Sequence, residues 1–383
     1  MKIYPALFLI LFAAFACKES KSQKPKGNAD STGIEVLSTA TPLFQQGESG
    51  YACFRIPALI KAANGDILAF CEARKNGCSD TGDIDLVMKR SKDYGQSWGS
   101  LEVIWDDGEN VCGNPAPVLE EESGSIHLLL TWNKGTDHES EIIAGESEDT
   151  RRIFHVRTED HGENWTEPKE ITATTKLPVW TWYATGPVHG IQLKRGIHAG
   201  RLIIPCDHIE AESKKYYSHV IYSDDLGESW QLGGTTPQDQ VNECTIAELP
   251  NGDLLLNMRN YARKESQTRQ IAISRDGGMT WEDQSFDEEL PEPRCQAAIL
   301  AIKKGEKDLL LFSNPAHGSD RKNMSLAISE NQGESWSRKK SIYAGHSAYS
   351  DLVEMDNGQI LLLHEGGENS AYDAILYTQL SIL

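Results

Sequence analysis

An eight-residue segment occurs five times between residues 91 and 336, and it constrains the fold of this chain more than any other feature. Each copy has the form Ser/Thr-x-Asp-x-Gly-x-Ser/Thr-Trp, except that Asn164 replaces Ser/Thr in the second copy and Asn331 replaces Asp in the last. The copies are SKDYGQSW from Ser91, TEDHGENW from Thr158, SDDLGESW from Ser223, SRDGGMTW from Ser274 and SENQGESW from Ser329. Self-similarity of this kind predicts a repeat architecture.

The residue types of the segment suit a tight turn between two strands. The Asp carboxylate can accept backbone N–H groups across the turn, and Gly adopts a positive φ without steric cost. The Trp supplies a large apolar anchor between neighbouring sheets. Successive copies start 51 to 67 residues apart, which suits a unit of four short strands. From Gly33 onward, roughly 350 residues therefore make about six such units.

A second repeat supports the same count. Apolar or alternating strands flank a Gly-containing turn in six places, which are Ala58–Phe70, Pro117–Leu130, Ile191–Ile204, Thr245–Leu256, Ile299–Phe312 and Leu352–Leu363. The last hairpin has no copy of the turn segment after it, so a strand from the other terminus, Ile34–Leu43, would complete its sheet. We predict an all-β fold, a six-bladed β-propeller of four-stranded antiparallel blades closed by this N-terminal strand.

The first 33 residues differ from the rest in composition. Lys2 is followed by the apolar run Ala6–Phe15, which is too short for a membrane span and is typical of a signal peptide over residues 1–16. Ala14-x-Ala16 suits ordinary cleavage and secretion, whereas Cys17 suits a lipoprotein site. We favour a lipid anchor at Cys17, because residues 17–33 form a polar tether. Residues 34–383 would be the propeller of an exported periplasmic or cell-surface lipoprotein.

Charge and cysteine usage narrow the function. A net charge of −20 argues against nucleic acid and anionic membranes as partners, so an anionic ligand would need a local group of arginines. The scattered histidines and the absence of CxxC and HExxH predict neither a metal site nor a cofactor. Cys78 and Cys112 lie in loop-like stretches and could pair, or could equally be two semi-buried thiols.

Polar residues lie at one common end of the predicted blades. In a propeller, the start of the first strand and the end of the second lie on the same side of a blade, at a mouth of the central channel. Residues at these positions are Arg55, Asn114, His189, Glu243, Gln296 and Tyr349 before the turns, and Arg74, Asn133, Asp207, Arg259, Asn314 and Glu365 after them. Such a cluster of polar and ionisable side chains at one rim is not expected in a propeller that has only a structural role.

Phe54-Arg55-Ile56-Pro57, together with the five turn segments, resembles the sialidase (neuraminidase) superfamily, specifically bacterial exo-α-sialidases. The resemblance covers nearly all of residues 34–383. It implies that Arg55, Arg259 and Arg321 bind the substrate carboxylate, which guanidinium groups suit through bidentate hydrogen bonds. It also implies that Arg74 contacts the substrate beside this triad and that Glu365 orients Arg55. Glu72, two residues before Arg74, could be a surface strand residue.

The resemblance further implies that Tyr349 is the nucleophile, that Glu243 assists it, and that an Asp in the loop after Arg74 is the general acid/base. A phenol avoids the like charge that a carboxylate nucleophile would meet at a carboxylate-bearing anomeric carbon. With an ordinary pKa of about 10, however, it needs a base. Asp80, Asp83 and Asp85 are all candidates for the acid; we favour Asp80 from its spacing to the first turn segment.

The resulting prediction is a monomeric enzyme that hydrolyses terminal sialic acid from glycans or glycoproteins with retention of configuration. The same residues would also serve a trans-sialidase or an anhydro-sugar-forming sialidase. A non-catalytic, glycan-binding propeller is the alternative outside enzymes.

Overall fold

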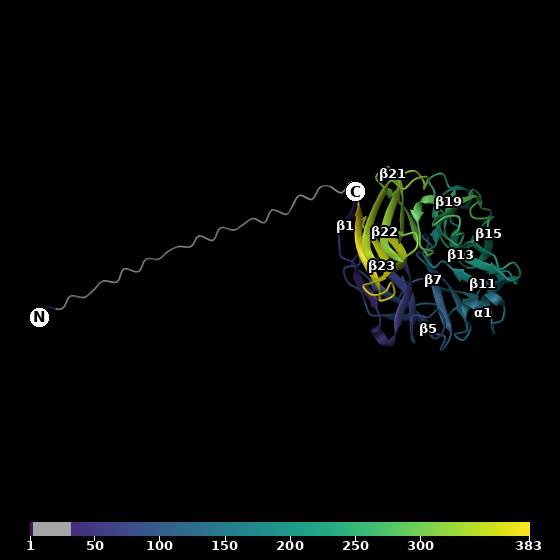
Figure 1. Ribbon diagram of the computed structural model, residues 1–383, viewed down its shortest axis with the longest axis horizontal. Helices are drawn as coiled ribbons and strands as arrows, with labels where there is room; N and C mark the ends of the chain where they lie inside the picture. The colour runs from purple at the N-terminus through teal and green to yellow at the C-terminus, as the bar shows by residue number, and fades with distance from the viewer. Residues whose placement is uncertain (3–31) are drawn as a thin grey trace.

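The computed structural model describes residues 1–2 and 32–383, and it is an all-β fold of antiparallel strands (Figure 1). The predicted signal peptide, Cys17 and most of the tether lie outside the described residues. Among the described residues, no helix is long and apolar enough to cross a membrane.

The strands form successive four-stranded units, numbered here from the N-terminal side. Unit 1 is β3 (Cys53–Lys61), β4 (Ile67–Arg74), β5 (Ile84–Ser91) and β6 (Glu102–Trp105). Unit 2 is β7 (Val111–Leu119), β8 (Ile126–Asn133), β9 (Arg152–Thr158) and β10 (Lys169–Glu170). Unit 3 is β11 (Trp180–Thr185) with β12 (Ile191–Gln192), β13 (Leu202–Glu210), β14 (Tyr216–Ser223) and β15 (Gln231–Thr235).

Unit 4 is β16 (Val241–Glu248), β17 (Leu254–Asn260), β18 (Thr268–Ser274) and β19 (Glu282–Pro291). Unit 5 is β20 (Ala298–Lys304), β21 (Lys307–Pro315), β22 (Lys322–Ser329) and the first half of β23 (Arg338–Glu354), whose second half starts unit 6 with β24 (Ile360–Gly367) and β25 (Ala374–Ile382). Helical turns are short: α1 (Glu139–Ala144), α2 (Thr172–Thr175), η1 (Glu48–Gly50) and η2 (Gly196–His198).

The N-terminal segment adds to the last unit. It forms two short strands, β1 (Ile34–Val36) and β2 (Thr41–Gln45), where the sequence suggested one continuous strand. Both pair antiparallel with β25, with Ile34 opposite Ile382 and Thr41 opposite Tyr377. Figure 1 shows β1 beside the yellow C-terminal strand. The two ends of the described fold thus share one sheet.

The five repeated segments form closely similar turns. In the copy from Ser223, the Ser223 hydroxyl accepts the Gly227 N–H at 2.9 Å, and Asp225 accepts the Ser229 N–H at 2.9 Å. The corresponding bonds recur in the other four copies, including the last, where Asn331 stands in place of Asp. These side chains stabilise turns, because their acceptors are used within the turn.

The hydrophobic core consists of layers between neighbouring units. One layer joins Phe70 of unit 1 to Leu128 of unit 2, and similar layers join units 2 and 3, 3 and 4, 4 and 5, and 5 and 6. A further layer joins Leu361 of unit 6 to Leu59 of unit 1. Each unit therefore buries both of its faces, and the first and last units contact each other.

Two cavities lie at opposite ends of the inner strands β3, β7, β16 and β23. A cavity of about 520 Å³ is lined by the later residues of these strands, such as Leu59, Val118, Ile246 and Leu352. A smaller cavity of about 220 Å³ is lined by their earlier residues, which are mostly polar. Of the residues that the sequence analysis predicted at one rim, those that line the smaller cavity are Arg55, Arg74, Asn114, Asp207, Glu243, Arg259 and Tyr349.

Candidate active site

The inner strands are irregular where they line the small cavity. The pairing register shifts between Arg55 and Ala58 in β3, between Gly113 and Ala116 in β7, and likewise around Glu243 in β16 and Tyr349 in β23. A β-bulge changes the direction of side chains on the bulged strand. These bulges therefore accompany the polar side chains that line the cavity, while the rest of each strand keeps its apolar packing.

Arg55 is buried and held on one side by Glu365. Its Nε donates to Glu365 Oε1 at 3.0 Å, and the Ile56 N–H donates to the same oxygen at 2.9 Å. Glu365 is fully buried on β24 and also accepts the Tyr349 N–H at 3.3 Å. A carboxylate so tightly bonded fixes the guanidinium and the nearby strand together, and this is a contact that the orienting role predicted for Glu365 requires.

Arg259, Glu243 and Tyr349 form a connected group. The Tyr349 hydroxyl donates to Glu243 Oε1 at 2.5 Å, and Arg259 Nη1 lies 2.5 Å from Glu243 Oε2 and 3.1 Å from the Tyr349 oxygen. These side chains come from β17, β16 and β23, so the fold joins residues about 90 to 106 positions apart. The carboxylate that could accept the phenolic proton is already in contact with it.

Arg321 completes the predicted triad. Its Nη1 donates to the Tyr372 hydroxyl at 2.9 Å, and its guanidinium lies 5.5 Å from the centre of the Tyr349 ring. Unlike Arg55 and Arg259, it has no carboxylate partner within the described residues. Among the described residues, Arg321 is thus the member of the arginine cluster (Arg55, Arg259 and Arg321) that has no carboxylate in contact, and this favours an anionic ligand beside it.

Tyr349 is a neutral phenol in this site. Burial raises its pKa well above the ordinary value and the charge of Glu243 raises it further, while Arg259 and Arg321 oppose the shift. The side chain is 5% exposed. Because the hydroxyl loses its proton only with difficulty, a base in direct contact is necessary for it to act as a nucleophile, and Glu243 occupies that position.

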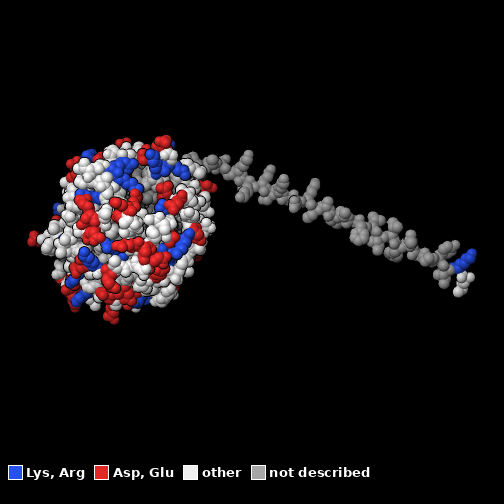
Figure 2. Space-filling view, turned by 180° about the vertical axis from the view of Figure 1, so that it is seen from behind, with Lys and Arg blue, Asp and Glu red and all other residues white. Residues whose placement is uncertain are grey.

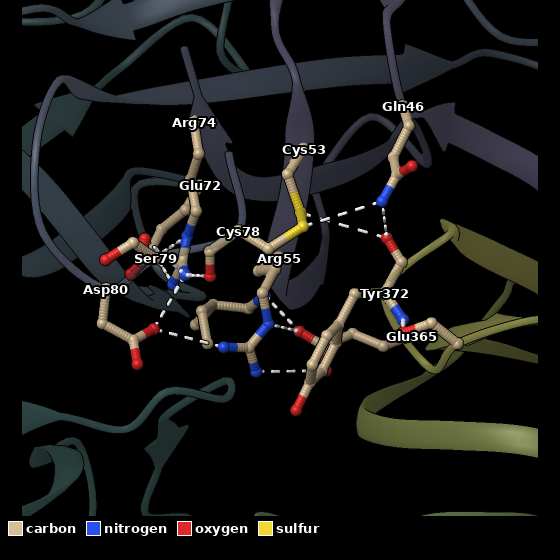
Figure 3. The surroundings of a disulfide bond; sticks show 12 residues. Gln46, Cys53, Arg55, Glu72, Arg74, Cys78, Ser79, Asp80, Glu365 and Tyr372 are labelled. Carbon is tan, nitrogen blue, oxygen red and sulfur yellow. Dashed lines mark hydrogen bonds and ion pairs between the residues drawn. A yellow bond between two sulfur atoms is a disulfide. The ribbon is translucent and has the colours of Figure 1, made fainter. Parts of the chain in front are cut away.

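Asp80 lies at the open side of the cavity, between two arginines (Figure 3). Its Oδ1 is 2.7 Å from Arg74 Nη1 and 3.2 Å from Arg55 Nη1, and the side chain is 59% exposed. Partial burial opposes ionisation, but the charges of Arg74 and Arg55 prevail and lower the pKa of Asp80. Asp83 and Asp85 instead contact Lys75, and Asp85 accepts the Tyr51 hydroxyl, so neither competes for this position.

A disulfide joins the loop that carries Asp80 to the strand that carries Arg55. Cys78 pairs with Cys53, whereas Cys112 is a free, buried thiol on β7, so the pairing suggested for Cys78 and Cys112 is wrong. Sequence alone did not reveal Cys53 as a partner because it lies inside a strand. Arg74 also binds this loop, since its Nη1 donates to the carbonyls of Cys78 and Ser79 (Figure 3).

Glu72 is not a surface residue, as the sequence had allowed. It is 3% exposed, lies 2.5 Å from Arg74 Nη2 and accepts the Asn114 N–H at 2.9 Å. Glu72 lies on β4 opposite Arg55, where β3 is bulged, and β7 of unit 2 approaches it closely enough to cover it. Glu72 therefore neutralises Arg74 and ties unit 1 to unit 2.

Several predicted rim residues do not line the small cavity. His189 binds Asp351 at 2.6 Å and lines the larger cavity, because the inner strand of unit 3 is interrupted between Thr185 and Ile191. Gln296 donates to the carbonyls of Pro187 and Ser350. Asn314 donates to the carbonyl of Pro291. The distance in sequence from the predicted turns does not place these side chains correctly, because they form hydrogen bonds between neighbouring segments and do not line the small cavity.

Other cavity residues were not recognised from the sequence. These are Arg151, Trp182, Tyr261, Tyr372 and Glu139. Each lies on a loop, on the short helix α1 or on the interrupted strand of unit 3, where neither the turn repeat nor the hairpin repeat sets a position. Arg151, directly before β9 in an Arg-Arg pair, offered no sequence signal that separates it from Arg152.

Arginines are concentrated at the small cavity, although the protein as a whole is acidic. Figure 2 shows acidic side chains spread over much of one face, with Lys and Arg in smaller groups among them, as the net charge of −20 requires. Arginines that line the small cavity are Arg55, Arg74, Arg151, Arg259 and Arg321. An anionic ligand would be held by this local group in an otherwise acidic protein.

Comparison with known proteins shows that this chain is similar to proteins named sialidases. The model of a family described as BNR repeat-like domain matches residues 65–362. A sialidase of Micromonospora viridifaciens is 29% identical over 94% of this chain, and one of Bacteroides fragilis is 28% identical over 83% of it. The chain spans only 57% and 61% of the lengths of these two relatives.

Solved structures give the same result. The Hadza microbial sialidase Hz136 has a TM-score of 0.80 at 28% identity, covering 90% of this chain and 68% of its own. A leech intramolecular trans-sialidase has a TM-score of 0.72 at 18% identity, covering 91% and 71%. This second similarity establishes a common fold only.

Proposed function

Since the chain belongs to the BNR repeat-like sialidase family, we propose that it is an exo-α-sialidase that hydrolyses terminal sialic acid from glycoconjugates. One observation carries the proposal: the Tyr349 hydroxyl donates to Glu243 beside the arginine cluster. A binding protein would need the arginines to hold a sugar acid. It would have no use for a buried phenol whose proton is already shared with a carboxylate.

The arginine cluster would hold the sugar carboxylate. Arg259 Nε is buried without a hydrogen-bond partner among the described residues, and Arg321 has no carboxylate partner there. A substrate carboxylate would fill these donors with charge-assisted hydrogen bonds. The negative charge of the substrate carboxylate would also offset part of the arginine charge that lowers the pKa of Asp80. The Asp80 carboxyl would thereby hold a proton more readily once substrate is bound.

Catalysis would proceed in two steps at the anomeric carbon. In the first, Tyr349 attacks as its proton passes to Glu243, while Asp80 gives its proton to the leaving oxygen. In the second, Asp80 takes a proton from water, which attacks the same carbon and displaces the Tyr349 oxygen, and Glu243 returns the proton. Two successive displacements, each with inversion at the anomeric carbon, retain the configuration overall. Arg74, bonded to Glu72 and Asp80, would position the acid and contact the sugar.

We also propose that the six units form a closed six-bladed propeller. Apolar layers between every pair of neighbouring units, including units 6 and 1, support closure. Pairing of β1 and β2 with β25 supports a last blade completed by the N-terminal segment. A ring brings inner strands from all units to one cavity, which explains how Arg55 and Tyr349 meet.

A fluorogenic aryl sialoside with NMR analysis of the product tests the function. We expect free sialic acid, released first as the α anomer, with full activity in the presence of a chelator. Transfer to an added galactoside, or an anhydro sugar as the sole product, would instead identify a transferase that uses the same residues. A folded protein that binds sialic acid but cleaves no sialoside would be a glycan-binding module.

Export and a lipid anchor at Cys17 remain a separate proposal, supported by the composition of residues 1–33. Mass spectrometry of the mature N-terminus in the native host tests it. A diacylated Cys17 is expected, and an unmodified N-terminus would indicate secretion.

A further inference from the structure

Arg151 is a buried arginine in the small cavity that the proposed mechanism does not use. It is 5% exposed and lies directly before β9. Its Nε donates to Asn133 and its Nη2 to Asn114, both at 3.2 Å, and both acceptors are neutral amide oxygens. Within the described part of the chain no carboxylate lies within ion-pair distance of it, and burial lowers its pKa. The charges of Glu72 and Glu139 act on it only from a greater distance, so this buried guanidinium has no ionic contact of its own and can bind a ligand.

The surroundings of Arg151 form a continuous polar wall, defined here as Asn114, Arg151, Trp182 and Asp207. The guanidinium stacks on the Trp182 ring at 4.1 Å. Along β11, Trp182 is followed on the same face by Ala184, which lies opposite Asp207 on β13. All four wall residues line the small cavity.

Asp207 provides a second, independent indication of a ligand. It is fully buried, its Oδ1 accepts Asn242 Nδ2 at 2.6 Å, and its Oδ2 has no partner among the described residues. Burial, and then the charge of Glu243, raise the pKa of Asp207 well above the ordinary value. When this carboxyl is protonated, its Oδ2 side is a hydrogen-bond donor and acceptor that lacks a partner among the described residues.

The polar wall faces the arginine cluster across the cavity. Wall residues belong to units 2 and 3, whereas the cluster and Tyr349 belong to units 1, 4, 5 and 6. A sugar acid whose carboxylate is held by the cluster would therefore present the far side of its ring to Arg151 and Asp207. Substituents on that side of the ring must therefore provide hydrogen-bond partners for the Arg151 guanidinium and the Asp207 carboxyl, which are both buried.

We propose that the polar wall binds a hydroxyl group of the substrate, so that the preferred sugar acid carries a hydroxyl on the side opposite its carboxylate in place of a methyl-terminated N-acetyl group. This rests on the proposed sialidase function. A hydroxyl can accept from Arg151 and exchange a hydrogen bond with Asp207. An N-acetyl carbonyl could accept one bond, but its methyl would leave the remaining polar groups unsatisfied. A site built to bind a hydroxyl discriminates strongly against analogues that lack it.

Three aryl glycosides that differ only in this substituent test the proposal: N-acetyl, N-glycolyl, and a hydroxyl directly on the ring. We expect kcat/KM for at least one hydroxyl-bearing substrate to exceed that for the N-acetyl substrate by about tenfold or more. Which of the two is faster shows whether the hydroxyl is ring-borne or carried by the glycolyl group. A wild-type enzyme that is fastest on the N-acetyl substrate would overturn the proposal.

Arg151→Met tests the residue, and Arg152→Met is the matched control, because Arg152 is its exposed neighbour and pairs with Asp149 and Glu170. The preference should fall to about threefold or less in Arg151→Met and stay at the wild-type ratio in Arg152→Met. An unchanged ratio in folded Arg151→Met would show a purely structural arginine. If that variant does not fold, Arg151→Lys replaces it, because lysine keeps the positive charge and lacks the two-pronged hydrogen-bonding geometry of the guanidinium. Arg151→Lys should reduce the ratio, and an unchanged ratio would contradict the proposal.

A folded protein that is inactive on all three glycosides would contradict the proposed sialidase function, but it would not contradict the proposal that the polar wall binds a hydroxyl group. In that case, the shift in melting temperature caused by each free sugar acid decides. A larger shift with a hydroxyl-bearing acid, lost in Arg151→Met, supports the wall as a binding site. Equal shifts, or none, would overturn it.

Discussion

At the scale of single residues, the site combines groups whose environments push their protonation states apart. Tyr349 is neutral because burial and Glu243 raise its pKa, and Asp80 is ionised because Arg74 and Arg55 lower its pKa despite partial burial. Substrate binding would change the second balance, because a carboxylate in the arginine cluster directly offsets the charge of Arg55. The acid would thus become competent when its substrate is in place.

Asp80→Asn is expected to separate two classes of substrate. A natural sialoside has a poor leaving group that needs a proton, so kcat should fall about 10²- to 10⁴-fold. An aryl sialoside leaves more readily without one, so its first step should fall much less. Steady-state kinetics on both substrates measures the difference. Equal losses would mean that Asp80 does not act as the acid.

Residues within motifs could be placed from the sequence, and residues outside them could not. Arg55 in Phe-Arg-Ile-Pro, Glu243 and Tyr349 all line the small cavity, because each lies near the start of an inner strand whose position the repeats set; for Tyr349 this strand is the second half of β23. Arg151 and Tyr372 were missed because loops bring them to the cavity. His189 was misplaced, since the break in the inner strand of unit 3 is not visible in the hydrophobic pattern.

At the scale of elements, the loop between β4 and β5 is fixed by covalent and ionic contacts at both ends. The disulfide between Cys53 and Cys78 spans 25 residues and attaches the loop two positions before Asp80. Arg74 binds the loop carbonyls and Asp80 itself. A loop with so few buried apolar residues depends on these contacts to hold its carboxyl at the cavity.

Replacing Cys78 with Ser should reduce activity by loosening this loop. We expect a stability loss of about 3 kcal/mol, typical of a loop of this length. We also expect kcat/KM of the remaining folded protein to fall about tenfold, since small misplacements of a catalytic group are costly. Denaturant unfolding and kinetics with and without reductant measure both. Cys53→Ser should behave identically, and full activity in either folded variant would contradict the role of the disulfide.

Trp230→Ala should have the opposite profile. Trp230 is 1% exposed and packs against His127 and His155 of the preceding unit, far from the polar cavity. Removing it should cost about 3–5 kcal/mol of unfolding free energy. At a temperature where the variant is folded, kcat/KM should stay within about twofold of the wild-type value. A large loss of kcat/KM would show that the repeated turns influence the site.

At the scale of the whole molecule, the layers between units contain buried histidines that are neutral. Burial lowers the pKa of His127 to about 4, of His155 to about 3, of His208 to about 3 and of His364 to about 4. His127 and His155 share a hydrogen bond of 2.9 Å beside Trp230. Protonation of such pairs would place charge inside the layers that join neighbouring units.

Stability should therefore decline as the pH falls below 6.5. In the unfolded chain a histidine has a pKa of about 6.5, so between that value and about 4 the unfolded chain binds more protons than the folded one. At pH 5 the loss is roughly 2 kcal/mol for each such histidine, and above pH 6.5 their contribution is flat. Melting temperatures from pH 7.5 to 4.5 test this. The His127→Gln, His155→Gln double variant should show a shallower decline, and an equal slope would contradict the assignment.

The all-β fold of successive four-stranded antiparallel units was predictable because the five turns and six hairpins fix the length of each unit independently of its details. What the repeats could not specify was the irregular part: two short N-terminal strands in place of one, the split inner strand of unit 3, and the Cys53–Cys78 pair. These features arise from contacts between units, which no periodicity within one unit encodes.

The central claim, that Tyr349 is the nucleophile of a retaining sialidase, is tested most directly by covalent labelling. A 2,3-difluoro sialic acid should form a long-lived adduct, and mass spectrometry of a proteolytic digest should locate it on the peptide that contains Tyr349. Tyr349→Phe should lose the label while still binding sialic acid through Arg55, Arg259 and Arg321. A label on Asp80 or Glu243, or an equally labelled Tyr349→Phe protein, would contradict the mechanism.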